Sequence, residues 1–166
     1  MGFTRQAAVS VILVSLTLCL QSVGMAVLID WARDSIERGI KMFSQWQASV
    51  LMIRFTTAII VLHFVEIVLW AGFYRWRCLP TWELSFYFSA TSYSTVGYGD
   101  VILPQVWRLL GPVESVTGVV MSGISVSALF AILVRLVQGQ DKTSGEGTAA
   151  AFEDQPREAV SVNEIG

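Results

Sequence analysis

The chain has 166 residues, of which 54% are hydrophobic and only 14% are charged, and its net charge is −2. About a quarter of the residues of a soluble domain are charged, so this composition excludes an ordinary soluble protein and indicates a small integral membrane protein. The charge balance offers no clustered basic face, which excludes nucleic acid as a partner. Cys19 and Cys78 do not make a disulfide framework. Both are interpreted as packing residues, and pairing of Cys78 with its copy in a neighbouring subunit is the alternative.

The first segment, residues 1–29, is predicted to be a transmembrane helix. Residues 7–29 carry no charge, and a stretch of that length crosses a bilayer. A cleaved signal peptide is the competing interpretation, but the apolar core is longer than the roughly 7 to 15 residues usual for one. The segment has no regularly spaced arginines of the kind that sense voltage, so gating by that route is not expected.

Residues 30–49 change character and are predicted to form an amphipathic connector at the membrane surface, on the cytoplasmic side. One helical face is mostly apolar, and the opposite face is charged through residues such as Arg33, Glu37 and Lys41. Two interpretations stay open: a lever that couples to an inner gate, or a passive connector.

Residues 50–138 contain two further apolar spans around a short segment. The span at 55–74 is interrupted by His63 and Glu66, which lie three apart on one helical face and can satisfy each other. Because ionisable groups at membrane depth are functional candidates, a pH-sensing or gating role stands beside a structural one. Trp70 and Tyr74, with the Trp and Arg residues that follow them, are interpreted as an interfacial belt.

A short helix is predicted from Trp82 to about Ser94, capped by Thr81 and with Glu83 in its first turn. It is too short to span a bilayer, so we expect it to dip into the membrane and return. Its aromatic residues are expected to form a sleeve around the segment that follows; they are Tyr87, Phe88 and Tyr93.

The segment that follows reads Thr95-Val96-Gly97-Tyr98-Gly99-Asp100. It resembles the selectivity filter of potassium channels, and the chain from about 54 to 137 resembles the pore domain of the bacterial members, with an extra N-terminal transmembrane helix. The resemblance implies an all-α, tetrameric pore fold: outer helix, re-entrant pore helix with filter, and inner helix. It also implies that K⁺ is coordinated by backbone carbonyls.

Matched residue by residue, the resemblance implies that K⁺ binds at Thr95, Val96, Gly97 and Tyr98. Successive carbonyls point at one axis only if alternate residues have backbone angles of opposite hand, which Gly97 and Gly99 can adopt freely. The residues expected to support the filter are Gly99, Asp100, Tyr87, Phe88 and Thr91. Thr91 stands where some members carry a glutamate that bonds the filter aspartate, so the partner of Asp100 is left open.

The last span is predicted at 115–134, after Pro112 in a first helical turn. Glu114 is interpreted as a helix-end acid rather than a ligand. The resemblance implies a gating hinge at a glycine of this inner helix, for which Gly118 and Gly123 are both candidates. Residues 139–166 are small, polar and acidic, and are predicted to be a disordered cytoplasmic tail.

The function expected from the resemblance is passive, K⁺-selective conduction by a homotetramer in a lipid bilayer, without enzymatic chemistry or cofactors other than the permeant ion. A potassium transporter subunit and a non-conducting accessory membrane protein are the alternatives. We expect a multi-pass protein of the cell membrane, in particular a bacterial inner membrane. The filter then faces outward, and the amino terminus lies on that same side.

Overall fold

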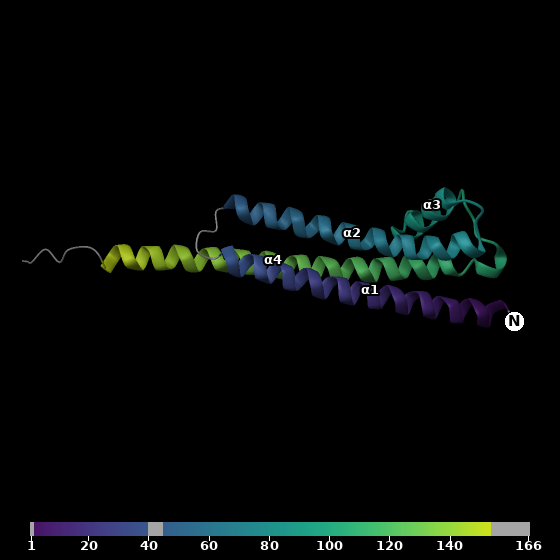
Figure 1. Cartoon of the computed structure of the whole chain (residues 1–166), viewed down its shortest axis with the longest axis horizontal. Helices are drawn as coiled ribbons and strands as arrows, with labels where there is room; N and C mark the ends of the chain where they lie inside the picture. The colour runs from purple at the N-terminus through teal and green to yellow at the C-terminus, as the bar shows by residue number, and fades with distance from the viewer. Residues whose placement is uncertain (1, 40–44, 154–166) are drawn as a thin grey trace, which may run out of the picture.

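The computed structural model describes residues 2–39 and 45–153, and every regular element in these ranges is helical. The elements are α1 (Gly2–Gly39), α2 (Gln45–Arg77), α3 (Trp82–Tyr93), the short 3₁₀ helix η1 (Gln105–Trp107) and α4 (Leu110–Glu153). The three long helices run along one another, and α3 lies at one end of the bundle (Figure 1). The amino terminus lies at that same end (Figure 1).

Three helical segments are long and apolar enough to cross a membrane: Phe3–Ile36, Trp46–Arg77 and Gln105–Gln138. They contain the uncharged run 7–29 and the predicted spans 55–74 and 115–134, and they extend beyond them, because a change to polar residues does not by itself end a helix. With α3 between the second and third segments, the all-helical, multi-pass class predicted from the sequence is confirmed.

The connector predicted at 30–49 is not a separate helix in the described ranges. Residues 30–39 continue α1, residues 45–49 begin α2, and 40–44 lie outside the described part of the chain. The physical reason is that no proline or glycine lies between Gly24 and Gly39, so nothing in this stretch of the sequence stops the helix. A change from apolar to charged residues does not by itself end a helix.

The predicted disordered tail also needs correction. Helix α4 continues through Glu153, so residues 139–153 are helical, while 154–166 lie outside the described ranges. Three consecutive alanines, residues 149–151, are strong helix formers, and the next proline is Pro156. The acidic, polar composition on which the prediction depended does not oppose a helix.

Helix α1 packs against both α2 and α4 along two apolar clusters. The cluster farther from α3 joins the three helices through buried Met25, Phe55 and Ile132. The cluster nearer α3 includes Leu13 of α1 and buries Trp70 completely. The N-terminal helix is therefore packed against α2 and α4 through both clusters.

The predicted interfacial belt is wrong for Trp70 and Tyr74, whereas Trp76 and Arg77 lie at the surface. Trp70 and Tyr74 are fully buried, because their polar atoms find partners inside the protein: Trp70 Nε1 donates to Thr17 Oγ1 of α1 at 2.9 Å. Trp76 is 73% exposed, and the guanidinium of Arg77 lies 4.0 Å from its ring centroid. The exposed end of α2 thus keeps the amphipathic character that suits a membrane interface.

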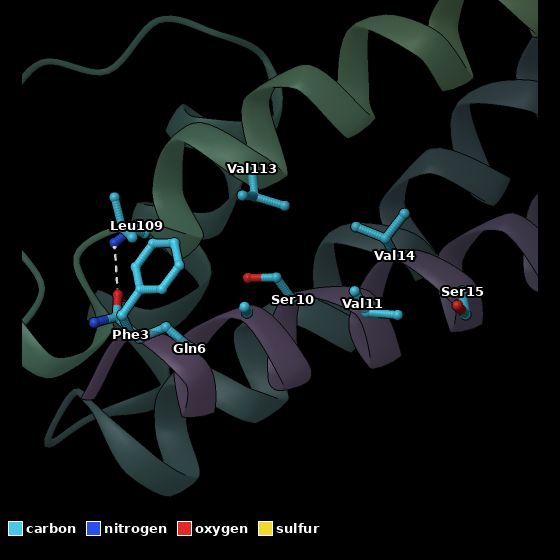
Figure 2. Close-up of a pocket in the computed structure, with 9 residues that line it drawn as sticks. Phe3, Gln6, Ser10, Val11, Val14, Ser15, Leu109 and Val113 are labelled. Carbon is cyan, nitrogen blue, oxygen red and sulfur yellow. Dashed lines mark hydrogen bonds between the residues drawn. The ribbon is translucent and has the colours of Figure 1, made fainter. Parts of the chain in front are cut away.

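The first turns of α1 lie beside the segment that leads into α4. The Leu109 N–H donates to Gln6 Oε1 at 3.3 Å, which is the dashed line in Figure 2. The Arg5 guanidinium lies 5.1 Å from the Trp107 ring centroid. Between these elements is an apolar groove of about 440 Å³, lined in part by Phe3, Val11 and Val113 (Figure 2). These contacts place the amino terminus at the α3 end of the bundle.

The two glycines considered as hinges have different surroundings. A Cβ added at Gly118 would lie 2.2 Å from the carbonyl oxygen of Tyr93, so α4 touches the backbone at the end of α3. A Cβ at Gly123 would meet nothing within 4 Å. Gly118 is therefore required for close packing, whereas Gly123 is free of that constraint; the hinge itself stays a prediction.

We expect Gly118→Ala to destabilise the protein by about 1–3 kcal/mol, because the added methyl group overlaps a backbone atom that cannot rotate away. Thermal unfolding of the purified protein in detergent measures the effect. The matched control is Gly123→Ala, which should be neutral or slightly stabilising because alanine is the better helix former. Equal midpoints for the two variants would contradict the packing role of Gly118.

The thiol of Cys78 is half-buried against the cluster nearer α3, and this burial raises its pKa to about 11. Because the thiolate is the nucleophile, we expect slow alkylation at neutral pH, with a rate that rises about tenfold per pH unit until the pH approaches that pKa. Rates measured between pH 7 and pH 11 test this, with Cys78→Ser to account for Cys19. A rate that levels off near pH 8.5, as for a free thiol, would contradict it.

Candidate functional site

Helix α3 carries the loop of residues 95–100 at its carboxyl end. Its start is capped as predicted: the Thr81 side chain accepts a hydrogen bond from Leu84 N at 3.3 Å, and Glu83 lies in the first turn. At its end, the loop folds back under the helix. Thr95 N donates to Ser92 O at 2.9 Å and Gly97 N donates to Thr91 O at 3.0 Å. The loop therefore satisfies helix-end carbonyls that would otherwise lack a donor.

The backbone of the loop alternates in hand. Thr95 has φ 62°, Gly97 has φ 49° and Gly99 has φ 80°, and these are the positive φ values in the described ranges. The conformation expected of the two glycines is therefore present. Thr95 was not expected to share it, and a β-branched residue there is strained. The alternation turns successive peptide groups in a way that a regular strand or helix does not.

The residues between these positions present their side chains on the surface of the chain. Val96 is 51% exposed and Tyr98 is 72% exposed. The Tyr98 ring stacks on that of Tyr87 of α3, with centroids 6.4 Å apart and planes 12° from parallel. Phe88, the neighbour of Tyr87, points into the chain instead and meets the Tyr74 ring edge-on at 5.0 Å. The expected aromatic sleeve is thus divided: Tyr87 faces the loop, and Phe88 anchors α3 to α2.

The structure supplies the partner of Asp100 that the sequence left open. Tyr87 Oη donates to Asp100 Oδ2 at 2.8 Å, and Val101 N donates to Oδ1 at 3.0 Å. The hydrogen bond to Asp100 raises the pKa of the exposed Tyr87 phenol, because the bond is lost when the phenol loses its proton. Thr91 does not replace a carboxyl group, because its hydroxyl is within bonding distance of the α3 carbonyls of Tyr87 and Phe88.

The His63–Glu66 pair predicted from the three-residue spacing is present. His63 Nδ1 lies 3.1 Å from Glu66 Oε2, and the Glu66 side chain is fully buried. The pair has partners beyond α2: the Tyr93 hydroxyl of α3 donates to Glu66 Oε2, and His63 Nε2 lies 3.1 Å from Ser125 Oγ of α4. Ser125 is in turn bonded to Gln21 of α1 at 2.9 Å. Polar side chains of all four α-helices thus meet beside the end of α3.

Glu114 is a site residue that the sequence analysis missed. It is fully buried near the start of α4, where Tyr74 Oη donates to its Oε2 at 2.8 Å. The Ser89 hydroxyl has two acceptors within reach, Glu114 Oε1 at 2.5 Å and the Ile67 carbonyl at 2.9 Å. The interpretation as a helix-end acid is therefore wrong, because the carboxyl group joins α2, α3 and α4.

The sequence of α3 contains a pattern that indicates the buried hydrogen bonds around Glu114. Ser85, Ser89 and Ser92 recur at helical spacing and are all buried. A stripe of small polar residues on one face of a short helix indicates close contact with another helix and buried hydrogen-bond partners. Here Ser115 of α4 donates to the Ser92 carbonyl at 2.7 Å.

The helices and loop define a multi-pass membrane protein in which a short helix and an irregular loop stand between two long spans. Residues 54–135 match a family model described as an ion channel, so these helices and the loop lie within the match. The match supports an ion channel. Helix α1 lies outside the matched residues. No curated protein and no solved structure matches the chain.

We expect Tyr74→Phe to lower the free energy of unfolding by about 1–3 kcal/mol, because it leaves a buried oxygen of Glu114 without its donor. Chemical or thermal unfolding in detergent measures the loss. Tyr87→Phe is the matched control, since it removes a tyrosine hydrogen bond to an acid at an exposed position and should leave the midpoint unchanged within error. The interpretation would be wrong if the two variants unfolded alike.

Proposed function

We propose that the chain is a subunit of a potassium-selective channel in which four copies surround one conduction axis. The observation that carries the proposal is the alternation of positive φ at Thr95, Gly97 and Gly99, in a loop at the end of a short helix. The ion-channel family match across residues 54–135 supports the same function. One chain supplies one such loop, and a ring of carbonyl groups needs four.

Coordination by backbone oxygens is the mechanism of selection. A permeating K⁺ exchanges its water shell for the carbonyl oxygens of residues 95–98, with the Thr95 hydroxyl below them, as in the potassium channel family. Because alternate residues have φ of opposite sign, the carbonyl groups of four loops can face a common axis. Tyr87 and Asp100 hold the outer end of each loop through their 2.8 Å hydrogen bond.

Electrostatics favour a cation below the loop. The carboxyl end of α3 carries the negative end of the helix dipole, and α3 ends at Tyr93, just before the loop. In the tetramer, four such helix ends face one cavity. The amino terminus lies with the loop on the outer side of the cell membrane, in keeping with the contact between Gln6 and Leu109, and the end of α4 is cytoplasmic.

Reconstitution of the purified chain in lipid bilayers tests the proposal. With a K⁺ gradient opposed to a Na⁺ gradient, the reversal potential should approach the K⁺ equilibrium value, in discrete single-channel steps. A reversal potential near zero would reject K⁺ selectivity. Flux without single-channel steps would indicate a transporter subunit.

Gly97→Ala should abolish K⁺-selective current. The added methyl group meets no atom within 4 Å, so the cost arises from the φ of +49°, which alanine adopts poorly. The matched control is Gly72→Ala, which also adds a methyl group with no neighbour within 4 Å but lies in helix α2. The control should conduct as the wild type does, and selective current through the Gly97 variant would contradict the proposed role.

A further inference from the structure

A chain of hydrogen bonds crosses the protein from α1 to the end of α3. Gln21 Nε2 lies 3.2 Å from the carbonyl oxygen of Met121 and 2.9 Å from Ser125 Oγ. Ser125 Oγ lies 3.1 Å from His63 Nε2. On the other side of the ring, His63 Nδ1 lies 3.1 Å from Glu66 Oε2 and 2.9 Å from the Tyr93 hydroxyl oxygen. The Tyr93 hydroxyl itself donates to Glu66 Oε2.

Elementary donor and acceptor rules give this chain one direction. A backbone carbonyl only accepts, so the group that faces Met121 must be the amide nitrogen of Gln21, which then also donates to Ser125. The hydroxyl of Ser125 accepts this bond and can still either donate or accept once more, so the other side of the His63 ring decides its role. The Tyr93 hydroxyl gives its hydrogen to Glu66, so its oxygen can only accept from His63 Nδ1. A neutral imidazole that donates at Nδ1 accepts at Nε2, and Ser125 therefore donates to Nε2.

The chain lies in apolar surroundings, where a broken link is costly. Gln21, Glu66 and Ser125 are at most 3% exposed. A buried polar group that loses its partner keeps the full penalty of leaving water, and linked hydrogen bonds strengthen one another. A displacement at one end is therefore resisted along the whole chain.

The far end of the chain is the residue that fixes where the 95–100 loop starts. Tyr93 is the last residue of α3, and its carbonyl oxygen packs against Gly118 of α4. The turn that follows it directs Thr95 N to the carbonyl of Ser92 at 2.9 Å. Because Thr95 has a strained φ, the loop depends on the position of the helix end before it.

We infer that Gln21 of the N-terminal helix is a positioning residue for the selectivity filter, acting through Ser125, His63 and Glu66 on Tyr93. The inference rests on the proposed function and adds a role for α1, which lies outside the matched channel domain. Helix α1 is then part of what holds the filter in its conducting form.

The first test examines the chain of hydrogen bonds by NMR and needs no electrical recording. His63 is the one histidine of the sequence, so ¹⁵N NMR of ¹⁵N-histidine-labelled protein in detergent reports its tautomer unambiguously. At a pH where the ring is neutral, the wild type should carry its proton on Nδ1. Ser125→Ala removes the donor to Nε2 and should shift the tautomer ratio toward Nε2–H by about fivefold, the effect of one net hydrogen bond. A wild-type ring protonated on Nε2 would overturn the inference.

The second test measures selectivity. Gln21→Leu keeps the side-chain bulk and removes both donated bonds, so the K⁺/Na⁺ permeability ratio in bilayers should fall by about fivefold, with the oligomer unchanged by size-exclusion chromatography. The matched control is Gln6→Leu, which cuts another α1 side-chain bond, to Leu109 N, outside the chain. Wild-type selectivity in the Gln21 variant would overturn the inference.

The two proposals fail differently. A selective wild type with a Gln21→Leu ratio equal to that of Gln6→Leu overturns the positioning role alone. A wild type that does not discriminate K⁺ from Na⁺ overturns the proposed function and the positioning role together. If Gln21→Leu does not assemble, Ser125→Ala removes less volume and tests the same chain by the same ratio, and an unchanged ratio there overturns the inference.

Discussion

Polar groups among apolar helices have no water to bond, and every irregular part of this fold depends on partners that the protein supplies itself. The loop at residues 95–100 meets this constraint by returning its own N–H groups to the end of α3, at Thr91 and Ser92. Helix α4 adds the Ser115 hydroxyl to the same carbonyl of Ser92. The loop can be irregular because these helix-end carbonyls have donors within the protein.

The same constraint explains two buried carboxyl groups. Glu114 accepts hydrogen bonds from Tyr74 and Ser89. Glu66 accepts a hydrogen bond from Tyr93 and lies within hydrogen-bond distance of His63. Each acid lies on a long helix and is bonded by a hydroxyl group from α3. Buried acids are stable only where such donors surround them, so the short helix is held on both sides by groups that cannot relax into solvent.

Helix α1 belongs to this arrangement through polar contacts within apolar packing. Thr17 accepts from Trp70 of α2, and Gln21 donates to Ser125 of α4. A helix surrounded only by lipid would have neither contact. Because both contacts lie within a transmembrane segment, α1 cannot separate from α2 and α4 without leaving buried polar atoms unpaired.

The sequence by itself determined what depends on neighbours along the chain. The apolar spans, the Thr81 cap, the glycine positions of the loop and the His63–Glu66 pair all follow from local spacing, because a helix or a turn fixes the distance between residues close in sequence. Only the tertiary structure decided which helices meet: that Tyr87 bonds Asp100, that Glu114 is buried rather than a helix-end acid, and that Gln21 reaches Ser125. These contacts join residues 13 to 104 positions apart, and their distances depend on how whole helices pack, which no local pattern contains.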